Sequence, residues 1–124
     1  MLGSFKLIGF VPTTDFARAK AFYVDVLGLR FIKDDGFALV LDANGNMVRV
    51  LKVADLKPAQ FTALGWEVSH IESVVASLEK KGVQFERYGF FEQDKHGIWT
   101  APKGDKVAWF KDPDGNTLSV SQHV

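Results

Sequence analysis

The 124-residue sequence contains no cysteine. This excludes disulfides, thiolate catalysis and every metal site that is built on cysteine. A surplus of charge of one sign is missing as well, because fifteen Lys and Arg residues balance fifteen Asp and Glu residues. Such a chain has no global attraction to nucleic acid or to an anionic membrane, so we expect neither as a partner.

Long apolar runs are also absent. No stretch approaches the roughly 20 apolar residues that span a bilayer. The opening residues, MLGSFKLIGF, lack the basic region and cleavage site of a signal peptide. What is present is the composition of a globular domain, with 47% hydrophobic and 24% charged residues. We therefore expect one cytoplasmic domain over residues 1–124.

An internal repeat divides this domain into two modules. With a shift of 70 residues, ALVLDANGNMVRV (38–50) aligns without a gap with AWFKDPDGNTLSV (108–120). With a shift of 54, GLRF (28–31) aligns with GVQF (82–85). Each half has the order β-α-β-β-β. Module 1 is expected at about 1–53 and module 2 at about 62–124, with a linker at about 54–61.

Local patterns place the elements within each module. The first helix is predicted to begin at Thr14 or Asp15 and to end at Gly28, and the second covers 71–81 and ends at Gly82. A longer loop, residues 88–106, belongs to the second module alone. Alternating and β-branched residues predict strands at 5–11, 29–33, 37–41, 47–53, 62–68, 83–88, 98–101, 106–111 and 117–122.

Three stretches carry a resemblance to a known family: DFARAKAFYVDVLGLRF (15–31), GWEVSHIESVVASLEKKGVQF (65–85) and VAWFKDPDGNTLSV (107–120). The chain resembles the vicinal-oxygen-chelate superfamily of glyoxalases, bleomycin-resistance proteins and extradiol dioxygenases. The resemblance implies an α+β fold in which two tandem βαβββ modules form an eight-stranded, incompletely closed barrel with helices outside. It also implies a binding site in the concave interior and a homodimer.

The resemblance further implies a divalent metal, held by His or Glu on the first and last strand of each module. At those four positions this sequence has Ile8, Arg49, Ala63 and Ser119. None of them is an imidazole or carboxylate donor, which such metal sites require. We therefore expect no metal and no other cofactor.

Side chains alternate between the two sides of a strand, so each of these four positions shares its side with residues two positions away. Together these residues would form the wall of an organic ligand site. Arg49 is the candidate anchor for a ligand carboxylate or phosphate. The alternatives are that it pairs with Glu67 or that its strand shifts by one residue and it points to solvent. Glu67 is a candidate general base if burial raises its pKa. The candidate ligand-binding residues are Ile8, Phe10, Met47, Arg49, Leu51, Ala63, Thr117, Ser119 and Ser121.

The long loop offers a second set of candidates. Glu92, Asp94 and His96 would share one face of an extended segment, and Trp99 follows them. These residues predict a lid over the pocket mouth. The alternative is that the charged side chains of the loop are simply solvated. Trp99 and Trp109 are alternatively aromatics of the core or rim.

Three classes of function remain open at this point. The first is a metal-independent binding protein for a small organic anion, similar to glyoxalase and bleomycin-resistance proteins. The second is an enzyme, either a lyase, an isomerase or a dioxygenase-like member with a non-standard site. The third is a non-catalytic dimeric regulatory subunit, because pocket residues alone do not establish turnover.

Overall fold

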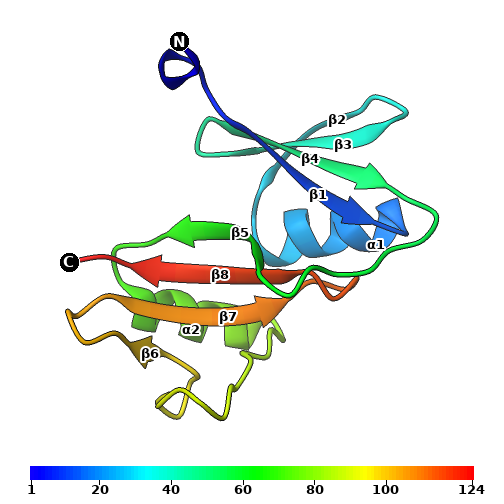
Figure 1. The fold of residues 1–124 in the computed structure, drawn as a ribbon. Helices are drawn as coiled ribbons and strands as arrows, with labels where there is room; N and C mark the ends of the chain where they lie inside the picture. Colours follow the sequence, from blue (N-terminus) through cyan, green and yellow to red (C-terminus); the bar gives the residue numbers. More distant parts are fainter. The chain divides into compact units, whose positions relative to one another are not determined.

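The computed structural model describes all residues from Met1 to Val124 and divides into two units, Met1–Lys57 and Pro58–Val124. The boundary lies inside residues 54–61. Each unit contains one β-α-β-β-β module with its own four-stranded sheet (Figure 1). The expected α+β architecture of two tandem modules is confirmed. None of the helices has the length and apolar character needed to cross a bilayer.

The first module builds a mixed sheet in the order β1-β4-β3-β2, in which β1 runs parallel to β4. The Asp15 side chain accepts a hydrogen bond from the Arg18 amide at 3.1 Å and so caps the helix as predicted. Gly28, with a φ of 82°, ends the helical segment in the left-handed region. The elements are a short 3-10 turn η1 (Leu2–Ser4), β1 (Ile8–Thr13), α1 (Phe16–Lys20), the π-helical continuation η2 (Ala21–Val26), β2 (Arg30–Asp34), β3 (Ala38–Ala43) and β4 (Asn46–Lys52).

One face of this sheet packs beneath its helix. Val11 on β1 and Val50 on β4 are paired in the sheet and fully buried. Ala19 and Tyr23, from the helical segment, are buried as well, and α1 packs against β4. The periodic apolar residues of the helix therefore pack against the alternate apolar residues of the strands in one core.

The second module repeats this plan in the order β5-β8-β7-β6, with β5 parallel to β8. Helix α2 packs against β7 and β8, and it buries Ile71 and Val75 (Figure 1). Leu118 and Phe110 on the strands are also buried. The elements are β5 (Thr62–Glu67), α2 (Ile71–Lys80), β6 (Trp99–Thr100), β7 (Lys106–Lys111) and β8 (Thr117–Gln122).

Two predicted strands differ from the structure. The strand expected at 83–88 is absent, and only Phe85 makes an isolated bridge, to Phe110. The Gln93 side chain occupies two backbone groups of this segment, because it accepts from the Tyr88 amide and donates to the Glu86 carbonyl. Only the Glu86 amide still bonds β7, at the Trp109 carbonyl, 2.8 Å away. The first strand begins at Ile8 rather than residue 5, because β4 offers its first ladder partner, Met47, only there.

Candidate functional site

The polar face of β8 forms the centre of the candidate site in the second module. Ser119 lies between Gly65 on β5 and Trp109 on β7, and Thr117 lies opposite Lys111. Thr117 and Ser119 are buried, at 7% and 8% exposure, although both are polar. The hydroxyls of β8 thus share a face with Trp109 and Lys111.

Gly65 allows this close arrangement. A Cβ atom built on Gly65 would lie 2.8 Å from the Ser119 Oγ atom. The absence of a side chain at Gly65 therefore leaves room for the Ser119 hydroxyl.

A cavity of about 690 Å³ lies at one end of this face. Its volume is in the range of sites that hold organic ligands, roughly 300–1,000 Å³. Lys111 is its one charged lining residue, and the Lys111 Nζ atom donates to the Thr117 hydroxyl at 3.1 Å. The wall is formed by Pro58, Ala59, Gln60, Phe61, Thr62, Tyr88, Phe90, Phe91, Trp109, Lys111, Gly115 and Thr117.

The aromatic residues of this wall stack on one another. Phe91 and Trp109 are parallel, with ring centroids 5.3 Å apart, and Tyr88 meets Trp109 edge-on at 5.5 Å. Phe90 remains 79% exposed and stacks on Tyr88 at 5.8 Å. Burial raises the pKa of Tyr88, so its phenol stays protonated and available as a donor at neutral pH. The cluster presents flat apolar surface together with one cation and a few hydroxyls.

Sequence reasoning missed most of this cavity. Tyr88, Phe90 and Phe91 belong to the YGFF stretch of the long loop, whose predicted site residues are Glu92, Asp94, His96 and Trp99. The parity argument was not extended to β7, where Trp109 and Lys111 face the same side as Ser119 and Thr117. Extending it would have indicated both residues.

The candidate residues of the first module also share one face. Ile8 pairs with Met47, and Phe10 pairs with Arg49, while Leu51 follows at the next same-side position of β4. Ile8 and Phe10 are exposed, at 46% and 54%. The predicted parity therefore brings these five side chains to one side of the first sheet.

Arg49 makes an ion pair that was not foreseen. Its Nη2 atom lies 2.7 Å from the Asp35 Oδ2 atom, and both side chains are 24% exposed. The hydrogen bond from Arg49 and those from the Phe37 and Ala38 amides lower the pKa of Asp35 from 3.8 to about 2. The partner of Arg49 is thus Asp35 in its own module, which offsets its charge.

Glu67 and Ala63 differ from what the parity argument assumed. Glu67 is exposed at the end of β5, beside Ser121 on β8, rather than buried among apolar groups. The desolvation that would make it a general base is therefore missing. Ala63 lies where the β5–β8 register shifts between Thr62 and Leu64, so simple alternation does not fix its side.

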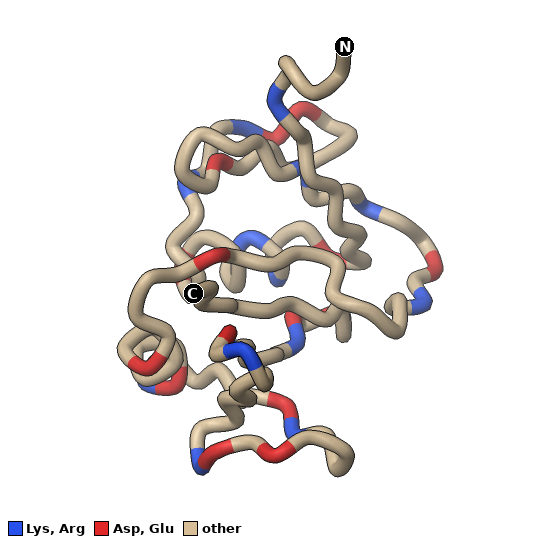
Figure 2. Tube along the Cα trace, turned by 60° about the vertical axis from the view of Figure 1, so that its left-hand side comes forward, with Lys and Arg blue, Asp and Glu red and all other residues tan.

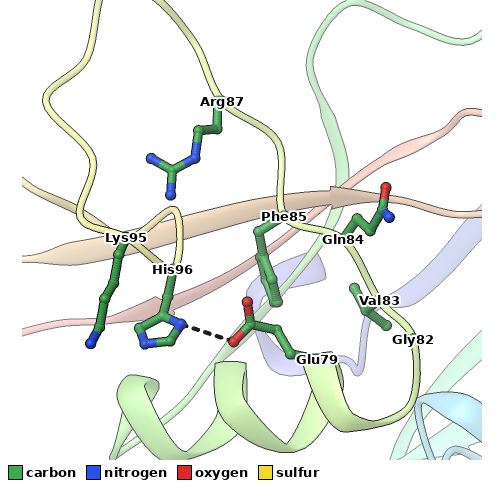
Figure 3. Close-up of a pocket in the computed structure, with 8 residues that line it drawn as sticks. All are labelled: Glu79, Gly82, Val83, Gln84, Phe85, Arg87, Lys95 and His96. Atoms are coloured by element: carbon green, nitrogen blue, oxygen red, sulfur yellow. Dashed lines mark hydrogen bonds and ion pairs between the residues drawn. The ribbon is translucent and has the colours of Figure 1, made fainter.

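The lid candidates have separate structural roles. Asp94 accepts hydrogen bonds from the amides of His96 and Ile98, which closes a turn. The His96 ring points at Glu79 on α2, with Nδ1 3.0 Å from Oε1, beside a second cavity of about 400 Å³ (Figure 3). Trp99 stands in the aromatic cluster, 4.6 Å from Phe91. Glu92 is exposed.

The sequence also matches a known protein family. The sequence model of the Glyoxalase/Bleomycin resistance protein/Dioxygenase superfamily matches residues 6–120. The chain belongs to this superfamily. A search of curated protein sequences gave no match.

Solved structures of other members share the fold at low sequence identity. A glyoxalase family protein from Bacillus anthracis is 17% identical, with a TM-score of 0.74 over 97% of this chain and 95% of that one. Lactoylglutathione lyase from Agrobacterium tumefaciens is 17% identical, with a TM-score of 0.73 over 96% and 93%. A superfamily member from Sphaerobacter thermophilus is 21% identical, with a TM-score of 0.73 over 96% and 97%. These similarities extend over both modules and concern the fold.

The metal that the superfamily resemblance implies does not fit the residues of this member. Ile8 and Ala63 carry no donor atom, and Arg49 is a cation already bonded to Asp35. Ser119 offers only a neutral hydroxyl. No group of three or more His, Asp or Glu side chains is placed to hold a metal ion. The donor set of these positions therefore does not suit a divalent transition metal.

Proposed function

We propose that this superfamily member is a metal-independent binding protein for a small organic anion that carries an aromatic ring. The observation that supports this proposal is the cavity of about 690 Å³ with five aromatic side chains and Lys111 as its charged residue. The aromatic faces would stack on a planar ligand, and Lys111 would pair with its carboxylate or phosphate.

Lys111 replaces Arg49 as the proposed anchor. An anion at Arg49 would have to compete with Asp35, whose carboxylate is 2.7 Å from the guanidinium. Lys111 has only the neutral Thr117 hydroxyl as a partner, and it can keep this contact while it binds an anion through another hydrogen of its ammonium group. The Thr117 hydroxyl, whose oxygen accepts from Lys111, would then donate its hydrogen to a neutral oxygen of the ligand.

A matched pair of probes tests the proposal. Titration of the protein with 2-naphthoate should quench part of its tryptophan fluorescence, since Trp109 lines the cavity. The neutral 2-naphthamide should bind about tenfold more weakly, because a charged hydrogen bond contributes roughly 1.5–3 kcal/mol. Lys111→Met should remove this preference, whereas Lys103→Met, at an exposed lysine outside the cavity, should keep it.

Two results would contradict the proposal. One is equal affinity for the two probes in the wild-type protein. The other is dependence on metal, seen as loss of naphthoate binding after dialysis against a chelator and recovery on addition of zinc or manganese. A requirement for metal would favour the enzyme alternative instead.

A further inference from the structure

Three side chains at the end of β8 form a hydrogen-bonded chain outside the cavity. The Ser121 Oγ atom lies 2.9 Å from the His123 Nε2 atom. The other ring nitrogen, Nδ1, lies 3.1 Å from the Asp105 Oδ2 atom. A serine hydroxyl, an imidazole and a carboxylate in this order are the groups that activate a serine nucleophile.

The roles of the two ring nitrogens follow from their partners. An ionised carboxylate has no hydrogen to donate, so in the neutral imidazole Nδ1 must carry the proton that bonds Asp105. Nε2 then has a free lone pair and accepts the hydrogen of the Ser121 hydroxyl. This is the tautomer in which histidine can take a proton from serine.

The sheet holds these groups in place. Lys106 pairs with Gln122 in the antiparallel β7–β8 ladder, so their outer neighbours Asp105 and His123 come together at its end. Asp105 also accepts a hydrogen bond from the Val124 amide at 3.0 Å. This bond and the bond from His123 lower the pKa of Asp105, which keeps it a carboxylate at neutral pH.

The chain of groups is separate from the proposed binding cavity. Ser121 does not line the cavity and is four residues along β8 from Thr117, which does, or ~14 Å at the usual rise of a strand. The side chains of His123 and Asp105 are 48% and 40% exposed. Ser121 itself is partly exposed, so a substrate can reach it from solvent without entering the cavity.

We propose that Ser121, His123 and Asp105 form an acyl-transfer site that hydrolyses small carboxylic esters with good leaving groups. The Ser121 oxygen attacks the ester carbonyl carbon while its proton passes to His123 Nε2. The bond from the carbonyl carbon to the leaving oxygen then breaks, and the leaving oxygen takes that proton. Water attacks the resulting acyl-serine, again losing a proton through His123, and releases the carboxylic acid and free Ser121. Asp105 stabilises the imidazolium that forms in each half of the reaction.

Release of p-nitrophenol from p-nitrophenyl acetate tests the proposal. Ser121→Ala and His123→Ala should each lower the protein-dependent rate at least about tenfold, since general-base assistance contributes roughly a hundredfold or more. Asp105→Asn should lower it as well, because it keeps an acceptor for the Val124 amide but removes the charge that fixes the tautomer. Ser77→Ala and His70→Ala, at an exposed serine and an exposed histidine on or beside α2, should react like the wild type.

A covalent probe gives the second measurement. A fluorophosphonate should add once per chain, at Ser121 by peptide mass spectrometry, and His123→Ala should prevent the addition. The proposal is overturned by a wild-type rate no higher than that of buffer, by an unchanged rate in Ser121→Ala, or by addition spread over other serines. These results are independent of the naphthoate titration, because p-nitrophenyl acetate needs no cavity to reach Ser121.

Discussion

Gly65 has no side chain, and the space beside it is occupied by the Ser119 hydroxyl. In Gly65→Ala the new Cβ would stand 2.8 Å from Ser119 Oγ, while the other neighbouring atoms, in Ser119 and Thr62, are at 3.8 Å or more. We expect this variant to lose about 1 kcal/mol of unfolding free energy, at the low end for overpacking, because a hydroxyl can rotate away. Urea denaturation measures the loss.

The same contact predicts coupling between the two residues. In a Ser119→Ala background the obstructing oxygen is gone, so adding Gly65→Ala should cost little or should stabilise the strand. Additive effects of the two substitutions would show that the 2.8 Å contact is not what limits position 65.

Asp35 makes stability depend on pH at the acid end. Its pKa is lowered from 3.8 to about 2, first by the hydrogen bond from Arg49 and then by those from the Phe37 and Ala38 amides. Because the folded state holds the charged form more strongly, this contribution is present above pH 4 and is lost as the pH falls toward 2. Asp35→Asn, which keeps an acceptor for both amides, should be less stable than the wild type at neutral pH.

The difference between the two proteins is the informative quantity, since other carboxylates titrate in both. Unfolding midpoints in urea at pH 7, 4, 3 and 2 should converge as the pH falls from about 4 to about 2. A difference that stays constant over this range would mean that the Arg49 pair does not supply the stability.

At the scale of elements, the loop between α2 and β6 depends on one side chain. Gln93 accepts from the Tyr88 amide at 2.7 Å and donates to the carbonyls of Glu86 and Gly97 at 2.9 and 2.7 Å. Gln93→Ala should therefore destabilise the protein by about 1.5–4.5 kcal/mol, given roughly 0.5–1.5 kcal/mol for each of the three hydrogen bonds. Hydrogen exchange should accelerate at the Tyr88 amide.

Gln84 provides the matched control, because it is exposed and lies in the same segment as Glu86. Gln84→Ala should leave both stability and exchange near the wild-type values. If Gln93→Ala exchanges no faster than this control, the loop is held by its aromatic cluster rather than by Gln93.

Local patterns predicted the elements well where partners are near in sequence. The caps at Asp15 and Gly28 and the strand at 117–122 each depend on neighbouring residues, and the structure has them. Segment 83–88 was wrong as a strand because a side chain several residues away competes for its backbone groups. Such competition leaves no periodic trace in a sequence.

The site was predictable only in part, for the same reason. Parity placed Thr117, Ser119 and Ser121 on one face, and the strand register agrees. Arg49, however, pairs with Asp35 through the conformation of the β2–β3 turn, and the YGFF aromatics meet Trp109 through the path of a long loop. Neither path follows from strand alternation.

At the scale of the whole molecule, charge gives little guidance to partners. Basic and acidic residues are interspersed along the chain (Figure 2). Fifteen of each leave no net charge. Exposed apolar surface is a better guide to self-association. The most evident such surface is at β1, an edge strand of the first sheet, where Ile8 and Phe10 are 46% and 54% exposed and the preceding Leu7 is 86% exposed.

We predict that the protein is a homodimer and that this edge takes part in the contact. An exposed apolar edge strand is a site of association unless another surface covers it. Light scattering should give twice the chain mass of 13.8 kDa. Phe10→Glu should shift the protein to the monomer, because a carboxylate buried in the contact would lack a partner.

Phe37→Glu is the matched control, since Phe37 is 81% exposed but lies in the β2–β3 turn, away from β1 in the sheet order. A wild-type monomer at micromolar to millimolar concentrations would contradict the dimer, and an equal effect of both substitutions would place the contact elsewhere.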